Sequence, residues 1–127
     1  MNEIALPVQQ AAELRACLTH EDSGLVAKLS GTADLRVTDS VEAILSRVHQ
    51  KALELGIPEV QMDLRDLEFM NSSCFKSFVS WISEVSDLTA GQYRIRFLSN
   101  PRILWQRRSL HALSCFAAEL VTIEAGN

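Results

Sequence analysis

Apolar and polar residues alternate in several short segments of the chain, and this alternation predicts β-strands with one buried face. The first two segments, 14–20 and 25–30, flank the turn sequence Glu21-Asp22-Ser23-Gly24, so we expect them to form a β-hairpin. The segment 60–70 alternates first and then stays apolar, which indicates a central strand. Two further strands are predicted, at 93–98 and 120–123.

The segment 38–55 has the period of an amphipathic helix instead, because its apolar residues recur at i, i+3, i+4 and i+7. Asp39 and Glu42 have the spacing of a capping box, which opens a helix. Gly56 suits a helix C-terminus, and Pro58 prevents the helix from continuing. We therefore expect a helix that begins near Asp39 and ends before Gly56.

Two more helices are predicted, one after each of the next two strands. The first begins at Asn71–Ser73, residue types that favour helix N-termini, and carries a broad apolar stripe. The second is expected to have Asn100 as its N-cap and Pro101 in its first turn, and to end near Leu113.

The order of elements is therefore β-β-α-β-α-β-α-β. Strands separated by helices of this length form mostly parallel sheets with right-handed crossovers. We expect an α/β fold with a mixed, mostly parallel sheet of four to five strands and three main helices packed on it. A length of 127 residues favours one domain over 1–127. Residues 1–13 give only weak signals, with a short helical turn expected at 9–14.

Charge and composition narrow the possible partners. The formal net charge is −4, which argues against nucleic acid as a partner. No apolar run is long enough for a membrane span, and the first residues lack the pattern of a signal peptide, so we expect no membrane insertion. Cys17, Cys74 and Cys115 are far apart and form no metal-binding pattern with the histidines, which predicts reduced thiols in a cytoplasmic protein without a metal or cofactor.

The most informative segment is Asn71-Ser72-Ser73, where a strand leads into a helix. A helix N-terminus has unpaired N–H groups and a partial positive charge, so its hydroxyls could receive a phosphate or could simply cap the helix. Cys74 could be an activated thiol, but a structural cysteine is the simpler interpretation. Neither a hydrolase nucleophile motif nor a glycine-rich phosphate loop is present, so the sequence favours a protein that is not an enzyme.

Other residues could take part in recognition or chemistry. Trp81 lies off the main apolar stripe of its helix and is expected to be partly exposed, as an interface anchor, although core packing is the alternative. Asp63 and Asp66 could form a pair of carboxylates, but strict alternation places them on opposite faces of their strand. A basic group on the last helix favours a solvated face or, next, a docking surface for an acidic partner; it comprises Arg102, Arg107 and Arg108.

Three patches resemble the STAS domain, the fold of the anti-sigma factor antagonists. The segment 29–34 is similar to the family's apolar strand followed by Gly-x-x-Asp, and 62–73 is similar to its strand that leads into Asp-Ser-Ser. Asn100-Pro101 and the helix after it match the family's late helix. The resemblance covers about residues 14–124. The chain departs from the family at Asn71, where Asp is usual, and at 74–76, where Gly-Leu-Gly is frequent.

The resemblance implies a partner-switching regulator that makes no chemical bond itself. It implies that a serine kinase, which is also the anti-sigma factor-like partner, phosphorylates Ser72 and, less favourably, Ser73. A metal-dependent serine phosphatase would remove the phosphate. The expected partner-binding residues are Asp34, Asn71, Ser73, Cys74, Lys76 and Trp81. The alternative is an accessory or ligand-binding subunit of the same fold, for example in a transport system, without phosphorylation. A homodimer through the N-terminal segment and an edge strand also stays open.

Overall fold

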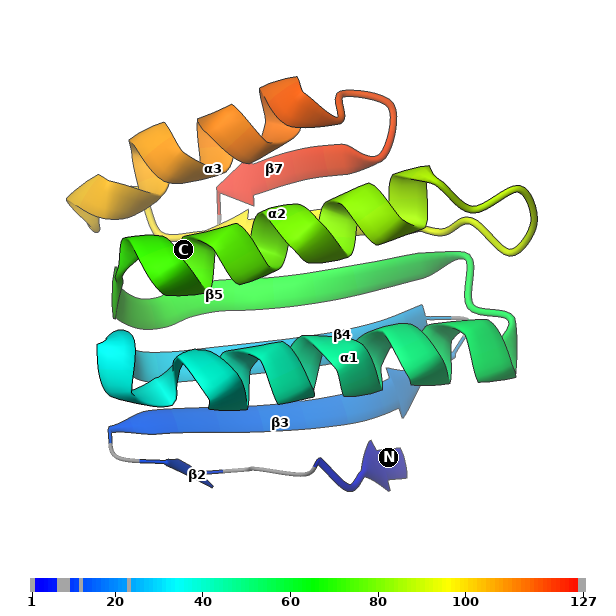
Figure 1. The fold of residues 1–127 in the computed structure, drawn as a ribbon, viewed down its shortest axis with the longest axis horizontal. Coiled ribbons are helices and arrows are strands. Elements are labelled where there is room, and N and C mark those ends of the chain that lie inside the picture. Colours follow the sequence, from blue (N-terminus) through cyan, green and yellow to red (C-terminus); the bar gives the residue numbers. More distant parts are fainter. Residues whose placement is uncertain (1, 7–9, 12, 23, 126–127) are drawn as a thin grey trace.

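The computed structural model describes residues 2–6, 10–11, 13–22 and 24–125. Its strands form one sheet in the order β1-β3-β4-β5-β6-β7, with β2 paired to β3 (Figure 1). The strands are β1 (Asn2–Ile4), β2 (Gln10–Ala11), β3 (Leu14–Glu21), β4 (Gly24–Ala33), β5 (Glu59–Met70), β6 (Arg94–Ser99) and β7 (Val121–Ala125). The helices are the 3-10 helix η1 (Leu35–Val37), α1 (Thr38–Leu55), α2 (Ser72–Ser86) and α3 (Leu104–Phe116).

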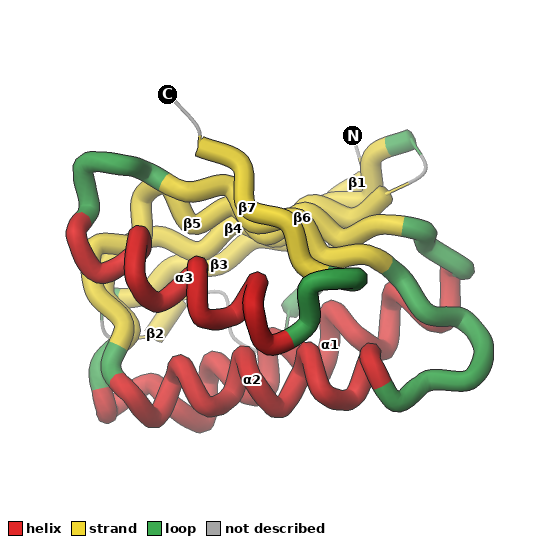
Figure 2. Tube along the Cα trace, turned by 90° about the horizontal axis from the view of Figure 1, so that it is seen from above, coloured by secondary structure: helices red, strands yellow, loops and turns green. Residues whose placement is uncertain are grey.

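The sheet is mixed, as the alternation of strands and helices predicts. β3 and β4 form the expected antiparallel hairpin, whereas β4, β5, β6 and β7 run parallel to one another. The three α-helices lie on one face of the sheet, and the core fills the space between the two layers (Figure 2). Because the four parallel strands point the same way, the helix N-termini gather at one end of the molecule (Figure 1).

The N-terminal region differs from expectation. β1 and β2 pair with β3 and enlarge the sheet to seven strands, where four to five were predicted. The helical turn predicted at 9–14 is wrong where the structure describes it, because Gln10 and Ala11 pair with Arg15 and Leu14. Positions 9 and 12 lie outside the described residues. The weak local signal here is overridden by backbone hydrogen bonding to the open edge of β3.

Two helix starts also differ. The capping box at Asp39 and Glu42 is wrong, because Asp34 caps the preceding η1, and η1 leads directly into α1. α1 ends as predicted, with Gly56 in a left-handed conformation. Asn100 does not cap α3: its Oδ1 accepts from the Arg102 N–H at 2.9 Å in a turn.

That turn delays the start of α3. Its N-cap is Ile103, which makes no side-chain capping bond, and the helix continues to Phe116 rather than ending near Leu113. Pro101 therefore lies in the turn and outside the helix.

Irregular pairing in β5 changes which face its side chains occupy. Lys28 pairs with Asp63 but Ser30 pairs with Asp66, so β5 holds one extra residue at this point. The bulge places Asp63 and Asp66 on the same, helix-free face, and the prediction of opposite faces is wrong. Strict alternation fails wherever a bulge shifts the register by one residue.

Candidate functional site

The candidate site lies where β4 and β5 end side by side. The Asn71 N–H donates to the carbonyl of Ala33 at 2.9 Å, so the residue after β5 is joined to the last residue of β4. Asp34 therefore lies next to the start of α2, as the resemblance implies. The Cys74 thiol lies 3.6 Å from the carbonyl oxygen of Asp34 and makes a second link between the two segments.

Asn71 caps α2. Its Oδ1 accepts a hydrogen bond from the Cys74 N–H at 2.9 Å, while its own backbone is extended. The helix begins at Ser72, as predicted. The backbone N–H groups of Ser72 and Ser73 lie in the first turn and have no intrahelical acceptor.

The two serines differ in exposure. Ser72 is exposed, and its hydroxyl bonds no protein atom among the residues that the structure describes, whereas Ser73 is half-buried. The carbonyl of Ser73 accepts from the Ser77 hydroxyl at 3.4 Å. Lys76, one turn after Ser72, is also exposed. Ser72 and Lys76 therefore share one accessible face of α2.

Asp34 is held by a local ion pair. Its carboxylate accepts from the Arg36 N–H at 2.9 Å and from the Arg36 guanidinium, with the shortest contact at 2.7 Å. Hydrogen bonding to Arg36 lowers the pKa of the Asp34 carboxyl below its usual value, so this group stays ionised at neutral pH. Asp34 and Arg36 thus form a fixed ion pair beside the start of α2.

Cys74 was predicted as a partner-binding residue, and the structure contradicts this. Its side chain is fully buried, at 0% exposure. Burial is the largest influence on the thiol and raises its pKa, although a weak contact with the Thr38 hydroxyl at 3.8 Å acts in the opposite direction. Cys74 packs the helix start against η1 and α1, so the structural interpretation of this cysteine holds.

Trp81 was also predicted as an exposed partner contact, and this too is wrong. Only 2% of its surface is exposed. Its indole N–H donates to the Tyr93 hydroxyl at 2.8 Å, and the same hydroxyl lies 2.6 Å from Nδ1 of His49. The helical periodicity places Trp81 beside the apolar stripe of α2 and so predicts exposure. In the structure, α1 and the residue before β6 pack against that side of α2 and bury Trp81.

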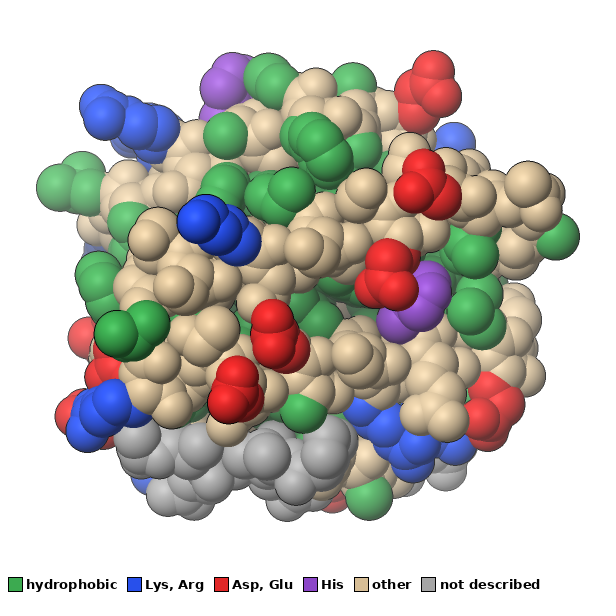
Figure 3. Space-filling model, in the orientation of Figure 1, with side chains coloured by type: hydrophobic (Ala, Val, Ile, Leu, Met, Phe, Trp, Pro, Cys, Tyr) green, Lys and Arg blue, Asp and Glu red, His purple; other side chains and the backbone are tan. Residues whose placement is uncertain are grey.

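One exposed apolar residue near the site was not anticipated from the sequence. Leu35 directly follows Asp34 and is 69% exposed. The sequence does contain a signal for this exposure, because Leu35 lies between Asp34 and the helix 38–55 and does not belong to the apolar stripe of that helix. Figure 3 shows that basic side chains project at the same end of the molecule, where α2 and α3 begin.

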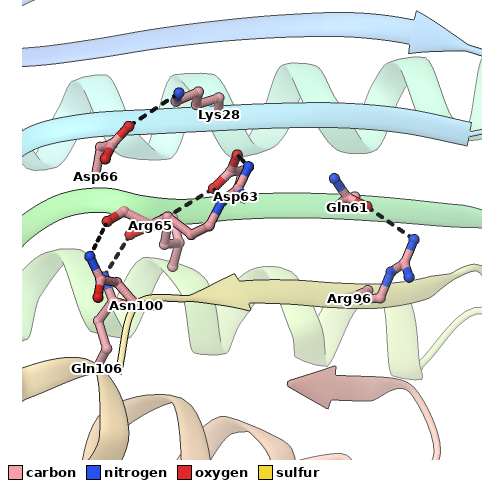
Figure 4. A network of polar contacts seen from close by, with 9 residues as sticks. Lys28, Gln61, Asp63, Arg65, Asp66, Arg96, Asn100 and Gln106 are labelled. Atoms are coloured by element: carbon pink, nitrogen blue, oxygen red, sulfur yellow. Dashed lines mark hydrogen bonds and ion pairs between the residues drawn. The ribbon is translucent and has the colours of Figure 1, made fainter. Parts of the chain in front are cut away.

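The helix-free face of the sheet carries a polar network (Figure 4). Arg65 donates to both oxygens of Asp63, at 2.9 and 2.8 Å, and Lys28 lies 3.2 Å from Asp66. Burial by itself would raise the pKa of Asp63, but its bonds with Arg65 outweigh this and lower it. Each carboxylate is therefore neutralised by its own cation, and the two do not form an acid–base pair.

Gln106 of α3 supports the bulge of β5 from the other side. Its side chain is 1% exposed and donates to the carbonyls of Leu64 and Leu67 at 2.6 and 3.0 Å. Within the described ranges, no group of three or more His, Cys, Asp or Glu side chains is arranged to hold a metal ion. Nor is any helix of these ranges long and apolar enough to cross a membrane.

Known proteins match this chain in three-dimensional structure but not in sequence. No protein-family model matches the chain, and no curated protein matches it by sequence. An anti-sigma factor antagonist from Mycobacterium paratuberculosis aligns with a TM-score of 0.64 and 15% identity, over 87% of this chain and 85% of that one.

Two structures of SpoIIAA align as well. The unphosphorylated form of this anti-sigma factor antagonist gives a TM-score of 0.58 at 14% identity, over 85% of this chain and 86% of that one. The phosphorylated form, described as a Bacillus cell fate determinant, gives a TM-score of 0.57 at 18% identity, over 85% of this chain and 89% of that one. The order of strands, the three helices on one face and these alignments agree: the chain has the STAS fold of the anti-sigma factor antagonists.

Proposed function

We propose that the protein is a cytoplasmic, non-catalytic regulator of the anti-sigma factor antagonist type, which binds a partner protein unless Ser72 is phosphorylated. The observation that carries this proposal is that capping and exposure fall on different residues at the start of α2. Asn71 supplies the cap, so the exposed Ser72 hydroxyl is not needed for capping and is free to be modified. Phosphorylated and unphosphorylated forms of SpoIIAA, which shares the fold, support the same view.

We name the partner-binding region the switch surface and define it by Asp34, Leu35, Asn71, Ser72, Ser73 and Lys76. It combines an exposed apolar side chain, Leu35, with a fixed carboxylate at Asp34 and an exposed amine at Lys76. Interfaces are typically built from an apolar anchor surrounded by polar groups of this kind. The partner would be a serine kinase of the anti-sigma factor type, and a metal-dependent serine phosphatase would reverse the modification.

Phosphorylation would act through local charge. A phosphate on Ser72 adds about −1.5 to −2 charge. Within the protein this charge is tolerated, because it lies at the N-terminus of α2 and one turn from Lys76. A partner covering the switch surface would have to desolvate the dianion. The phosphate would also compete with the partner for the Lys76 amine. The affinity for the partner therefore falls, while the fold is unchanged.

The first test is mass spectrometry of the protein from its native cells. We expect phosphate on the peptide that spans Met70 to Lys76, located on Ser72. Ser80 offers a matched control, because it is exposed on the same helix two turns later. Kinase activity from those cells should label the wild type and Ser80→Ala but not Ser72→Ala.

The second test measures affinity for the kinase identified in this way. Ser72→Asp should weaken binding about tenfold or more, which corresponds to about 1.4 kcal/mol, with an unchanged circular dichroism spectrum. Leu35→Ser should also weaken binding, whereas Leu55→Ser, at the opposite end of α1 and 42% exposed, should not. Phosphate confined to Ser73, or equal affinity for Ser72→Asp, would refute the switch. A protein that is never phosphorylated would favour the accessory-subunit alternative.

A further inference from the structure

A hollow of about 440 Å³ lies between α3 and the carboxyl ends of β6 and β7, apart from the switch surface. Its volume falls within the range of about 300–1,000 Å³ that is typical of small-molecule sites. The carboxyl ends of parallel strands are the usual place for ligands in open α/β sheets. The lining side chains that matter for its chemistry are Ser99, Pro101, Arg107, His111, Ser114 and Ile123.

The hollow is electropositive although the protein is acidic. Among the described residues that line it there is no Asp or Glu, and α3 contains neither residue type. Arg107 forms no ion pair or hydrogen bond within the described part of the chain. It also lies near the N-terminus of α3, where the helix dipole disfavours a cation. Arg107 therefore contributes little to the stability of the fold, and its charge is available to a ligand.

The two serine hydroxyls of the hollow already donate their hydrogens to backbone carbonyls, so the donors for a ligand must come from other side chains. The Ser99 hydroxyl donates to the carbonyl of Glu124 at 3.4 Å, and the Ser114 hydroxyl donates to that of His111 at 2.7 Å. Nε2 of His111 lies 3.5 Å from the Cys115 thiol; when the thiol donates to it, Nδ1 carries the ring proton and can donate to a ligand. The donors available to a ligand are thus the Arg107 guanidinium and the His111 imidazole N–H, which suit an acceptor with negative charge.

The backbone argues for a carboxylate over a phosphate. Phosphate sites usually present several free N–H groups to the ligand. In the turn before α3, the N–H of Asn100 donates to Gln106, that of Arg102 to the Asn100 side chain, and that of Ile103 to the Asn100 carbonyl. A single guanidinium instead matches one carboxylate through two parallel hydrogen bonds. Ile123, 37% exposed, and Pro101 provide apolar surface for the body of the ligand.

We propose that this hollow binds a small organic acid, with its carboxylate on Arg107 and His111 and its apolar body over Ile123 and Pro101. The site does not depend on the modification of Ser72. Its occupant would add a metabolite-sensing input to the protein, beside the partner-binding function of the switch surface.

The test is an NMR titration of the ¹⁵N-labelled protein with 2-naphthoate. We expect saturable shifts at Ser99, His111 and Ser114, and little effect from 2-naphthalenemethanol, which has the same ring system but no charge. Arg107→Gln should raise the dissociation constant about tenfold or more. Arg108→Gln provides the matched control, because Arg108 is the exposed neighbour and does not line the hollow.

Each contrary result overturns the proposal. Absence of saturable shifts would exclude the site, and equal binding of the neutral alcohol would exclude recognition of charge. Equal effects of the two arginine substitutions would exclude a specific role for Arg107. Inorganic phosphate that displaces 2-naphthoate at the same concentration would contradict the assignment to a carboxylate. Both substitutions are on the surface, and circular dichroism checks that the folded state is intact.

Discussion

The substitution Tyr93→Phe tests whether the hydrogen bonds of one buried hydroxyl stabilise the packing of α1 and α2 against the residue before β6. The Tyr93 hydroxyl accepts from the Trp81 indole N–H and lies within hydrogen-bond distance of His49. Because the indole can only donate, the phenolic hydrogen is free for Nδ1 of His49. Tyr93→Phe leaves the Trp81 N–H without a partner at a site that is 2% exposed, whereas the half-buried His49 can bond water.

The expected cost follows from that single orphaned donor. A buried unsatisfied donor costs about 1–3 kcal/mol. With an unfolding entropy of about 2.1 cal/mol/K per residue, 127 residues give roughly 0.27 kcal/mol/K, so the melting temperature should fall by roughly 4–11 °C. Urea denaturation of the wild type and Tyr93→Phe measures the change in the free energy of unfolding.

The control is the same substitution in a Trp81→Phe background, which has no indole N–H to leave unpaired. There, Tyr93→Phe should cost about 1 kcal/mol less, and the difference is the coupling energy between the two side chains. A change below about 0.5 kcal/mol in the wild-type background, with no coupling, would show that the Trp81–Tyr93 hydrogen bond does not stabilise the fold.

The same residue gives the protein a dependence on alkaline pH. Burial raises the pKa of Tyr93, the only tyrosine in the chain, far above its ordinary value, although the bond from Trp81 lowers it in part. In the unfolded chain the phenol ionises near pH 10, so above about pH 10 the unfolded state binds fewer protons and stability falls as the pH rises. Tyr93→Phe should lack this loss. Tyrosinate absorbance that rises near pH 10 while the protein stays folded would contradict the assignment.

Two more predictions concern the start of α2. Asn71→Ala should destabilise the protein by about 1 kcal/mol, because the Cys74 N–H loses its acceptor, while Asn71→Asp retains a capping oxygen and should change stability far less. Urea denaturation compares the two variants, and equal stability would show that the cap contributes nothing. An aromatic disulfide reagent should modify the exposed Cys17 and Cys115 quickly and the buried Cys74 slowly, because burial both shields the thiol and raises its pKa. Three equally fast thiols would contradict the structural role of Cys74.

Local patterns were sufficient to predict much of the framework. The β3–β4 hairpin, the helix that ends at Gly56 and the start of α2 at Ser72 all follow from short-range rules of alternation, turns and caps. The order of strands and helices then predicts a mostly parallel sheet, and the resemblance to the STAS fold is confirmed by the solved structures. The hairpin, the helix end and the helix start depend on interactions between residues that are close in sequence.

The order of elements also predicts which residues meet at the site, because Asp34 and Asn71 each directly follow one of two parallel strands. Which side chains near the site are accessible depends instead on packing between segments that are distant in sequence. Trp81 and Cys74 are covered by α1, η1 and the residues before β6, and the bulge in β5 brings Asp63 and Asp66 to one face. Exposure and register depend on contacts between segments 12 to 40 residues apart, such as Trp81 with Tyr93 and Cys74 with Asp34, and no local periodicity encodes those contacts.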